Sequence, residues 1–214
     1  MSVESVLSAL EAVHGRAEWT PRGDPLGTLM ACVLSQHTSD ANTQRAFDRL
    51  RQRFASWNEV ANAPTAGVEE AIRCGGLARS KAPRIQEILR RIRDRNGTFD
   101  LDCLGGMDDA AARDYLTGLP GVGPKTAAIV LCFALGRPVL PVDTHVFRVA
   151  WRLGLIQRRI GEARAHNALG ARVPPPLVYR FHMALLRHGR TVCRARAPRC
   201  HDCPLASRCA HPGP

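Results

Sequence analysis

Three absences limit what this chain of 214 residues encodes. Its longest apolar run, from Ala127 to Leu135, has nine residues and is far too short to span a bilayer. Its N-terminus carries Glu4 and Glu11 and no basic segment, so we expect no secretion signal, no membrane partner and a cytoplasmic protein. It also contains no convincing series of alternating strands and no internal repeat, which leaves a helical globular protein as the expectation.

Lysine is nearly absent, although the chain is strongly basic. Of the 30 basic residues only Lys81 and Lys125 are lysine, and the formal net charge is +11. A balance of this kind favours a polyanionic partner such as nucleic acid. Arginine is suited to bidentate phosphate contacts, whereas lysine can lose its proton and act as a nucleophile. Any chemistry that needs a side-chain amine therefore has two candidates.

Apolar spacing and helix-breaking residues predict an all-α fold. A helix is expected from Arg79 to Asn96, because four apolar residues fall at i, i+3, i+4 and i+7. These residues are Ile85, Ile88, Leu89 and Ile92. Further helices are expected near residues 2–14, 25–36, 40–54, 66–74, 108–118, 124–135, 144–154, 161–171 and 176–188.

A glycine-rich turn separates two of these helices at residues 119–128, which read LPGVGPKTAA. Gly121 and Gly123 permit a tight hairpin whose backbone can approach another molecule closely, and Pro124 suits the first position of a helix. The segment has two interpretations. The hairpin N–H groups form a site for an anion such as a phosphate, or the segment is only a turn between core helices. Lys125 takes the second helical position, where the helix dipole favours the neutral amine; a solvated lysine or a phosphate contact is the alternative.

A second polar segment begins 18 residues after that lysine, with Asp143. Asp143 precedes an apolar-periodic stretch, so its default role is to cap a helix N-terminus. A capping carboxylate is held rigidly, and it can serve as well as an electrostatic or general-base group. His145 is either a core or capping histidine or a polar contact at a nucleic-acid surface.

Four of the eight cysteines crowd the C-terminus in the pattern C-x6-C-x2-C-x5-C. The four are Cys193, Cys200, Cys203 and Cys209. The spacing fits zinc ribbons poorly and suits an iron–sulfur cluster with four thiolate ligands, with zinc and disulfides as alternatives. The intervening residues Arg194, Arg196 and Arg199 offer phosphate contacts. The other cysteines (Cys32, Cys74, Cys103 and Cys132) are expected to be small core residues.

Taken in order, the hairpin, the VDTH segment at 142–145 and the cysteine pattern resemble the endonuclease III family of DNA glycosylases. The likeness extends from about residue 24 to 210 and includes the segments 34–40 and 76–82. It implies two helical domains with a cleft between them. One is a six-helix domain with the helix-hairpin-helix motif, over 24–136. The other, over 1–23 plus 137–214, holds a [4Fe-4S] cluster on the four C-terminal cysteines.

The resemblance also implies a chemistry. A monomer would bind double-stranded DNA containing damaged bases or abasic sites, on the nucleoid in a bacterium, and would remove oxidised pyrimidines. Lys125 would attack C1′ of the flipped nucleotide and form a Schiff base, Asp143 would stabilise the cationic sugar, and β-elimination would nick the strand. In the family, certain side chains fill the gap that the flipped nucleotide leaves in the duplex. The residues at the matching positions here are Gln36 or His37, together with Leu77 and His145.

The sequence departs from the family pattern at the turn before residue 40, because it reads Ser-Gln-His-Thr where relatives often place the glutamine one residue later. Pro124 also stands where many relatives have a basic residue, and the 98–116 connection is long. Two other functions stay open: a monofunctional, mismatch-specific glycosylase of the same superfamily, and a non-catalytic helix-hairpin-helix DNA-binding protein. The pair of Lys125 and Asp143 distinguishes the enzyme from a non-catalytic DNA-binding protein, which would not need these two residues.

Overall fold

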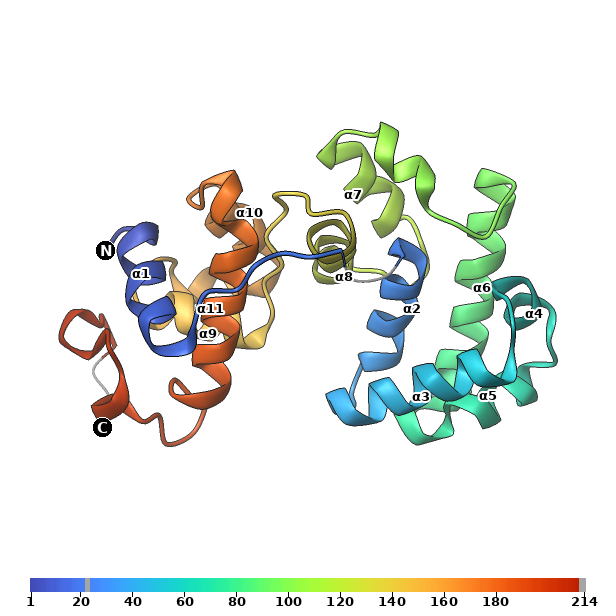
Figure 1. The fold of residues 1–214 in the computed structure, drawn as a ribbon, viewed down its shortest axis with the longest axis horizontal. Helices are drawn as coiled ribbons and strands as arrows, with labels where there is room; N and C mark the ends of the chain where they lie inside the picture. The colour runs from blue at the N-terminus through green and yellow to red at the C-terminus, as the bar shows by residue number, and fades with distance from the viewer. Residues whose placement is uncertain (22–23, 212–214) are drawn as a thin grey trace. The chain divides into compact units, whose positions relative to one another are not determined.

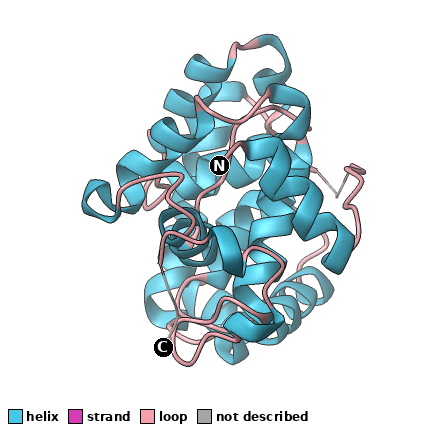
Figure 2. Ribbon diagram, turned by 90° about the vertical axis from the view of Figure 1, so that its left-hand side faces the viewer, coloured by secondary structure: helices cyan, strands magenta, loops and turns pink. Residues whose placement is uncertain are grey.

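The computed structural model describes residues 1–21 and 24–211, and throughout this part of the chain the regular structure is helical, with no strand (Figure 2). The chain separates into two compact units, one made of Met1–Pro21 with Gly136–Pro214 and the other of Arg22–Leu135. Residue 23, at the first expected domain boundary, lies outside the described residues. No helix in the described ranges combines the length and the apolarity needed to cross a bilayer. The all-α prediction is confirmed.

Over its described residues, the unit Arg22–Leu135 contains seven α-helices (Figure 1). They are α2 (Pro25–Ser35), α3 (Asp40–Arg53), α4 (Trp57–Asn62), α5 (Thr65–Ile72), α6 (Ala78–Asn96), α7 (Asp109–Thr117) and α8 (Pro124–Ile129). Side-chain caps start four of them, because the Asp24, Ser39, Ser56 and Asp108 oxygens each accept a hydrogen bond from a first-turn N–H. α2 is the central helix of this unit and packs against α3, α6 and α8.

Helix α6 forms as the apolar spacing predicts. Its four periodic residues, from Ile85 to Ile92, are fully buried, and Gly97 ends it in the left-handed conformation with φ of 78°. Burying one such aliphatic side chain contributes about 1.5–3 kcal/mol, so this stripe fixes α6 to the core of its unit.

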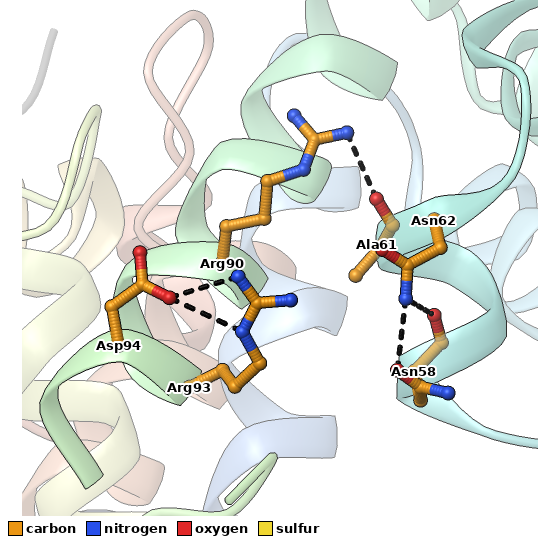
Figure 3. A network of polar contacts seen from close by, with 6 residues as sticks. All are labelled: Asn58, Ala61, Asn62, Arg90, Arg93 and Asp94. Atoms are coloured by element: carbon orange, nitrogen blue, oxygen red, sulfur yellow. Dashed lines mark hydrogen bonds and ion pairs between the residues drawn. The ribbon is translucent and has the colours of Figure 1, made fainter. Parts of the chain in front are cut away.

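Helix α4 is absent from the helices that the sequence predicts, which leave residues 55–65 unassigned. The helix has only six residues, too few for an apolar period to show. A neighbouring helix holds it, because the Arg90 guanidinium of α6 donates to the Ala61 carbonyl at 2.9 Å (Figure 3). Within α4 the Asn62 amide donates to the Asn58 carbonyl. Tertiary contacts therefore supply what local pattern does not.

The other unit holds α1 (Val3–His14), α9 (Thr144–Arg152), α10 (Gly161–Gly170) and α11 (Val178–Thr191). α11 is its central helix and packs against both α1 and α9. The Arg180 guanidinium donates to both carboxylate oxygens of Glu11 at 2.9 and 2.6 Å, which joins α11 to the N-terminal helix.

Two of the expected helices differ from the observed ones at their ends. The helix expected over 124–135 ends as an α-helix at Ile129, and residues Val130–Ala134 form a π-helical turn. The helix expected from residue 176 begins at Val178, because the prolines before it form a separate 3₁₀ turn, and it continues to Thr191 rather than 188. Proline lacks the N–H that a continued helix would need.

Candidate functional site

The hairpin between α7 and α8 has the conformation that its glycines allow. Gly121 has a φ of 72°, in the left-handed region. A Cβ atom there would lie 2.7 Å from Cδ of Arg84. Both the backbone conformation and this contact therefore favour glycine at position 121. Gly123 is the N-cap of α8 and offers no side-chain cap, and a Cβ at this position would meet nothing within 4 Å. The backbone N–H groups of the first turn of α8 thus have no capping side chain.

Gln36, just after α2, is bound into this hairpin. Its amide oxygen accepts from Arg84 at 3.0 Å, and its amide nitrogen lies 3.4 Å from the Gly121 carbonyl. These contacts hold the Gln36 side chain within its own unit. They give it a structural role that sequence reasoning did not assign.

His37 and Leu77 share a different and unusual conformation. Both have φ values in the left-handed region, 54° and 51°, and among the described non-glycine residues only Ala197 shares this feature. Both side chains are exposed, and Leu77 is 55% accessible. Left-handed backbone is costly for a residue with a Cβ, and strain of this kind gathers at functional sites.

The two lysines have opposite environments. Lys125 is exposed and is the second residue of α8. Lys81 is 1% accessible, and its Nζ donates to the carbonyl oxygens of Leu34 at 2.6 Å and Gly75 at 2.9 Å. Burial lowers the pKa of Lys81. A lysine without access to solvent cannot reach a macromolecular substrate, so the structure leaves Lys125 as the available lysine amine.

In the other unit, Asp143 is the N-cap of α9, and its Oδ1 accepts a hydrogen bond from the N–H of Val146 at 2.7 Å. The carboxylate is half-buried. His145 is half-buried as well: its Nδ1 lies 3.0 Å from Nη2 of Arg148. A Cβ on Gly189 would lie 2.9 Å from the His145 Cβ, so the glycine allows α9 and α11 to approach.

All four C-terminal cysteines line one pocket of about 230 Å³ in the same unit as Asp143. Their thiols are free and half-buried. Between residues 193 and 209 the regular structure is limited to the 3₁₀ turns Cys200–Asp202 and Ala206–Arg208. A segment with so little regular structure depends on whatever joins its cysteines.

The pocket wall carries a buried cation. Arg152 is 8% accessible, its Nη1 lies 3.4 Å from the Cys193 sulfur, and its Nε has no hydrogen-bond partner. Nη1 and Nη2 also donate to the carbonyls of Arg194 and Ala195, but no carboxylate pairs with the guanidinium among the ion pairs of the described residues. A buried charge without a counter-charge is expensive. Four thiolates and the group they hold would supply the missing negative charge, so the residues present fit a thiolate-bound cluster.

No three His, Cys, Asp or Glu side chains of the described residues converge closely enough to hold a single metal ion. A zinc ion needs its sulfur ligands at about 2.3 Å, whereas a cubane distributes four thiolates over four irons. Both groups would use the same four thiols that line this pocket.

His188 adds a polar contact to this pocket that the sequence analysis missed. Its Nε2 lies 3.5 Å from the Cys203 sulfur, and its Nδ1 lies 3.1 Å from Nε2 of His14. Burial, and secondarily His14, lower the pKa of His188 to about 4. At neutral pH the ring carries one N–H, so it donates either to the sulfur or to His14.

The three arginines of the cysteine segment are exposed but not equivalent. Arg199 forms an ion pair with Asp202 at 3.0 Å, and Arg194 donates to the Thr191 carbonyl at 3.1 Å. Arg196 extends from the same exposed stretch.

Comparison with known proteins gives the family. Residues 30–175 match the model of the HhH-GPD superfamily of base excision DNA repair proteins. The chain is 36% identical over 186 residues to endonuclease III of Thermotoga maritima, covering 87% of this chain and 83% of that protein. It is also 36% identical over 190 residues to a protein of Arabidopsis thaliana named for DNA glycosylase activity. That match covers 84% of this chain, which spans only 64% of the plant protein.

The fold comparison agrees. A solved structure of a trapped covalent intermediate of endonuclease III with DNA superposes with a TM-score of 0.80 at 30% identity, covering 97% of this chain and 94% of that one. The family model spans more than half of the chain, and the bacterial relative is covered over most of its length. The chain therefore belongs to the HhH-GPD superfamily of base excision DNA repair proteins and, within it, to the endonuclease III family.

Proposed function

We propose that this chain is a bifunctional DNA glycosylase and AP lyase that removes oxidised pyrimidines from duplex DNA through a lysine Schiff base. The observation that carries the proposal is the exposed amine of Lys125, directly after the glycine hairpin, while the second lysine is buried and engaged. Kinship with endonuclease III supports the same reaction. The two domains are those over 24–136 and over 1–23 plus 137–214.

The reaction begins when the damaged nucleotide leaves the base stack, because C1′ is inaccessible inside the duplex. The neutral Lys125 amine attacks C1′, a C–N bond forms, and the glycosidic bond breaks with its electron pair leaving on the base. Ring opening of the sugar gives the Schiff base. Loss of a proton from C2′ then expels the 3′ phosphate by cleavage of the C3′–O bond, which nicks the strand.

Asp143 is the electrostatic partner in this proposal. Its carboxylate stabilises the positive charge that develops at C1′ and assists proton transfer. The N-cap bond to Val146 fixes the carboxylate without neutralising it. A pre-oriented charge stabilises a transition state without reorganisation at the moment of reaction.

DNA binding is assigned to three groups of residues. Gly121 and Gly123 let the hairpin N–H groups reach a backbone phosphate. His37 and Leu77 fill the position of the flipped nucleotide, with His145 near the lesion; Gln36, held by Arg84, supports the hairpin. Arg194, Arg196 and Arg199 contact phosphates, consistent with the net charge of +11. The protein acts as a monomer in the cytoplasm, on the nucleoid in a bacterium.

A [4Fe-4S] cluster on Cys193, Cys200, Cys203 and Cys209 is the proposed cofactor. When bound, it supplies a covalent cross-link of the C-terminal segment rather than a reacting group. The segment around it presents the arginines in one fixed shape, and Arg152 supplies the compensating positive charge.

Borohydride reduction tests the reaction, because it converts a Schiff base into a stable covalent complex. The wild-type chain is expected to be trapped on duplex DNA with an abasic site, and Lys125→Gln is expected to lose trapping completely. Lys125→Arg is the matched control: it keeps a cation for phosphate but no nucleophilic amine, so it binds DNA like the wild type and is not trapped.

Each other outcome has a distinct meaning. Full trapping of Lys125→Gln means that the nucleophile is wrongly assigned. Base release by the wild type without trapping identifies a monofunctional glycosylase, and binding without base release identifies a non-catalytic binder.

A further inference from the structure

Lys81 is among the largest fully buried side chains of the protein, and it is a cation. Its Nζ bonds two backbone carbonyls, that of Leu34 at 2.6 Å and that of Gly75 at 2.9 Å. No carboxylate pairs with it among the ion pairs of the described residues. Burying a charge is costly, and an apolar side chain of similar volume would fill the same space at lower cost.

The two carbonyls belong to separate segments that each come to an end at this point. Leu34 lies in the last turn of α2, and Gly75 closes the 3₁₀ turn Arg73–Gly75. Carbonyls at helix ends lack intrahelical donors, and a cation is favoured beside them. One ammonium group therefore satisfies two such ends, whose carbonyls lie 47 and 6 residues before Lys81 in the sequence.

Each linked segment leads directly into a strained, exposed residue. His37 follows Leu34 by three positions and Leu77 follows Gly75 by two, and both have left-handed backbone with φ near 50°. Their side chains point outward into solvent rather than into the core. Strained residues persist only where the surrounding structure fixes the backbone on either side.

We propose that Lys81 is a positioning residue: by binding both carbonyls, its ammonium group sets the separation of His37 and Leu77, so that the two side chains enter the same gap in the duplex. The inference rests on the proposed function, since it concerns how the damaged nucleotide is displaced. Lys81 itself touches neither DNA nor the reacting atoms.

The chain supplies a matched control on the same helix. Gln86 is also 1% accessible, and its Nε2 bonds the carbonyls of Val60 at 3.0 Å and Ala63 at 2.8 Å. It thus joins α6 to α4 and the residue after it, away from His37 and Leu77. Lys81→Met and Gln86→Met each remove a buried tie to two carbonyls, and both are expected to lose stability.

The distinguishing readout is the fluorescence of 2-aminopurine placed opposite a tetrahydrofuran abasic analogue in duplex DNA. At saturation the wild type and Gln86→Met are expected to give the same rise in fluorescence, below the melting temperature of each protein. Lys81→Met is expected to give a smaller rise at saturation and to bind about 10- to 100-fold more weakly, because small misplacements of positioned groups have effects of that size. Adding Lys81→Met to Leu77→Ala is expected to change the fluorescence no further.

The inference is wrong if Lys81→Met behaves like Gln86→Met in fluorescence and affinity, because Lys81 then only supports the fold. If Lys81→Met does not fold, Lys81→Gln keeps an amide donor in the same place, and a smaller loss in the same direction is expected; no loss overturns the inference. Borohydride trapping of the wild type is measured in parallel. If the wild type is not trapped, the proposed function is rejected. If the wild type is trapped and the Lys81 variants have the fluorescence and affinity of Gln86→Met, only this inference is rejected.

Discussion

At the scale of the residue, Asp143 combines two roles that one substitution can separate. Asparagine caps a helix about as well as aspartate, because its Oδ1 can accept the same hydrogen bond from Val146. Asp143→Asn is therefore expected to keep the melting temperature of the wild type and to lose most of the base-excision rate. Single-turnover kinetics with an oxidised-pyrimidine duplex, beside thermal unfolding, measures both.

Asp143→Ala is the comparison for this experiment. It removes the cap together with the charge, so its free energy of unfolding is expected to fall by about 1 kcal/mol. Equal rates of excision for wild type and Asp143→Asn would contradict the assigned role of the carboxylate.

Residue scale is also where the sequence was least informative. Lys81 follows Ser80 and Lys125 follows Pro124, each near the start of a helix, and nothing local marks one lysine as buried. Arg152 and His188 are not recognisable for the same reason: each is one of several polar residues on an amphipathic helix, and its orientation toward the cysteine pocket depends on packing.

At the scale of the element, the hairpin contains two glycines that differ in whether a side chain can be accommodated. Gly121→Ala is expected to destabilise the protein by roughly 1–2 kcal/mol or more, since it adds left-handed strain and a contact with Arg84. Gly123→Ala is expected to change stability by less than about 0.5 kcal/mol, because its Cβ enters open space. That space is where a phosphate would approach, so the same variant should bind DNA several-fold more weakly.

Thermal unfolding and a DNA-binding titration of both variants test this assignment. Gly123→Ala with unaltered affinity would mean that the hairpin does not contact the DNA backbone closely.

Elements were predicted well wherever local signals were strong. α6 was expected from residue 79 to 96 and is observed from 78 to 96, because an apolar stripe and a terminal glycine act together. α4 was missed, since its six residues are held by Arg90 from another helix. The π-helical turn after α8 has no sequence signal either.

At the scale of the whole molecule, only one of the two units contains the cysteine pocket. The purified chain is expected to be yellow-brown with about four irons. Removal of the iron should raise hydrogen exchange in Met1–Pro21 and Gly136–Pro214 and leave Arg22–Leu135 unchanged, because metal binding couples to the folding of the segment that holds it. Iron analysis and hydrogen-exchange mass spectrometry measure the two effects; a colourless zinc protein would overturn the cofactor proposal.

The bond from Arg187 of α11 to the His14 carbonyl joins residues 173 positions apart, and this separation has a consequence during translation. Helix α1 is synthesised well before α11, which packs against it. The continuous middle segment can collapse meanwhile, since domains generally fold as units. A nascent chain thus carries an uncovered amphipathic helix, a ready target for chaperones, until α11 emerges.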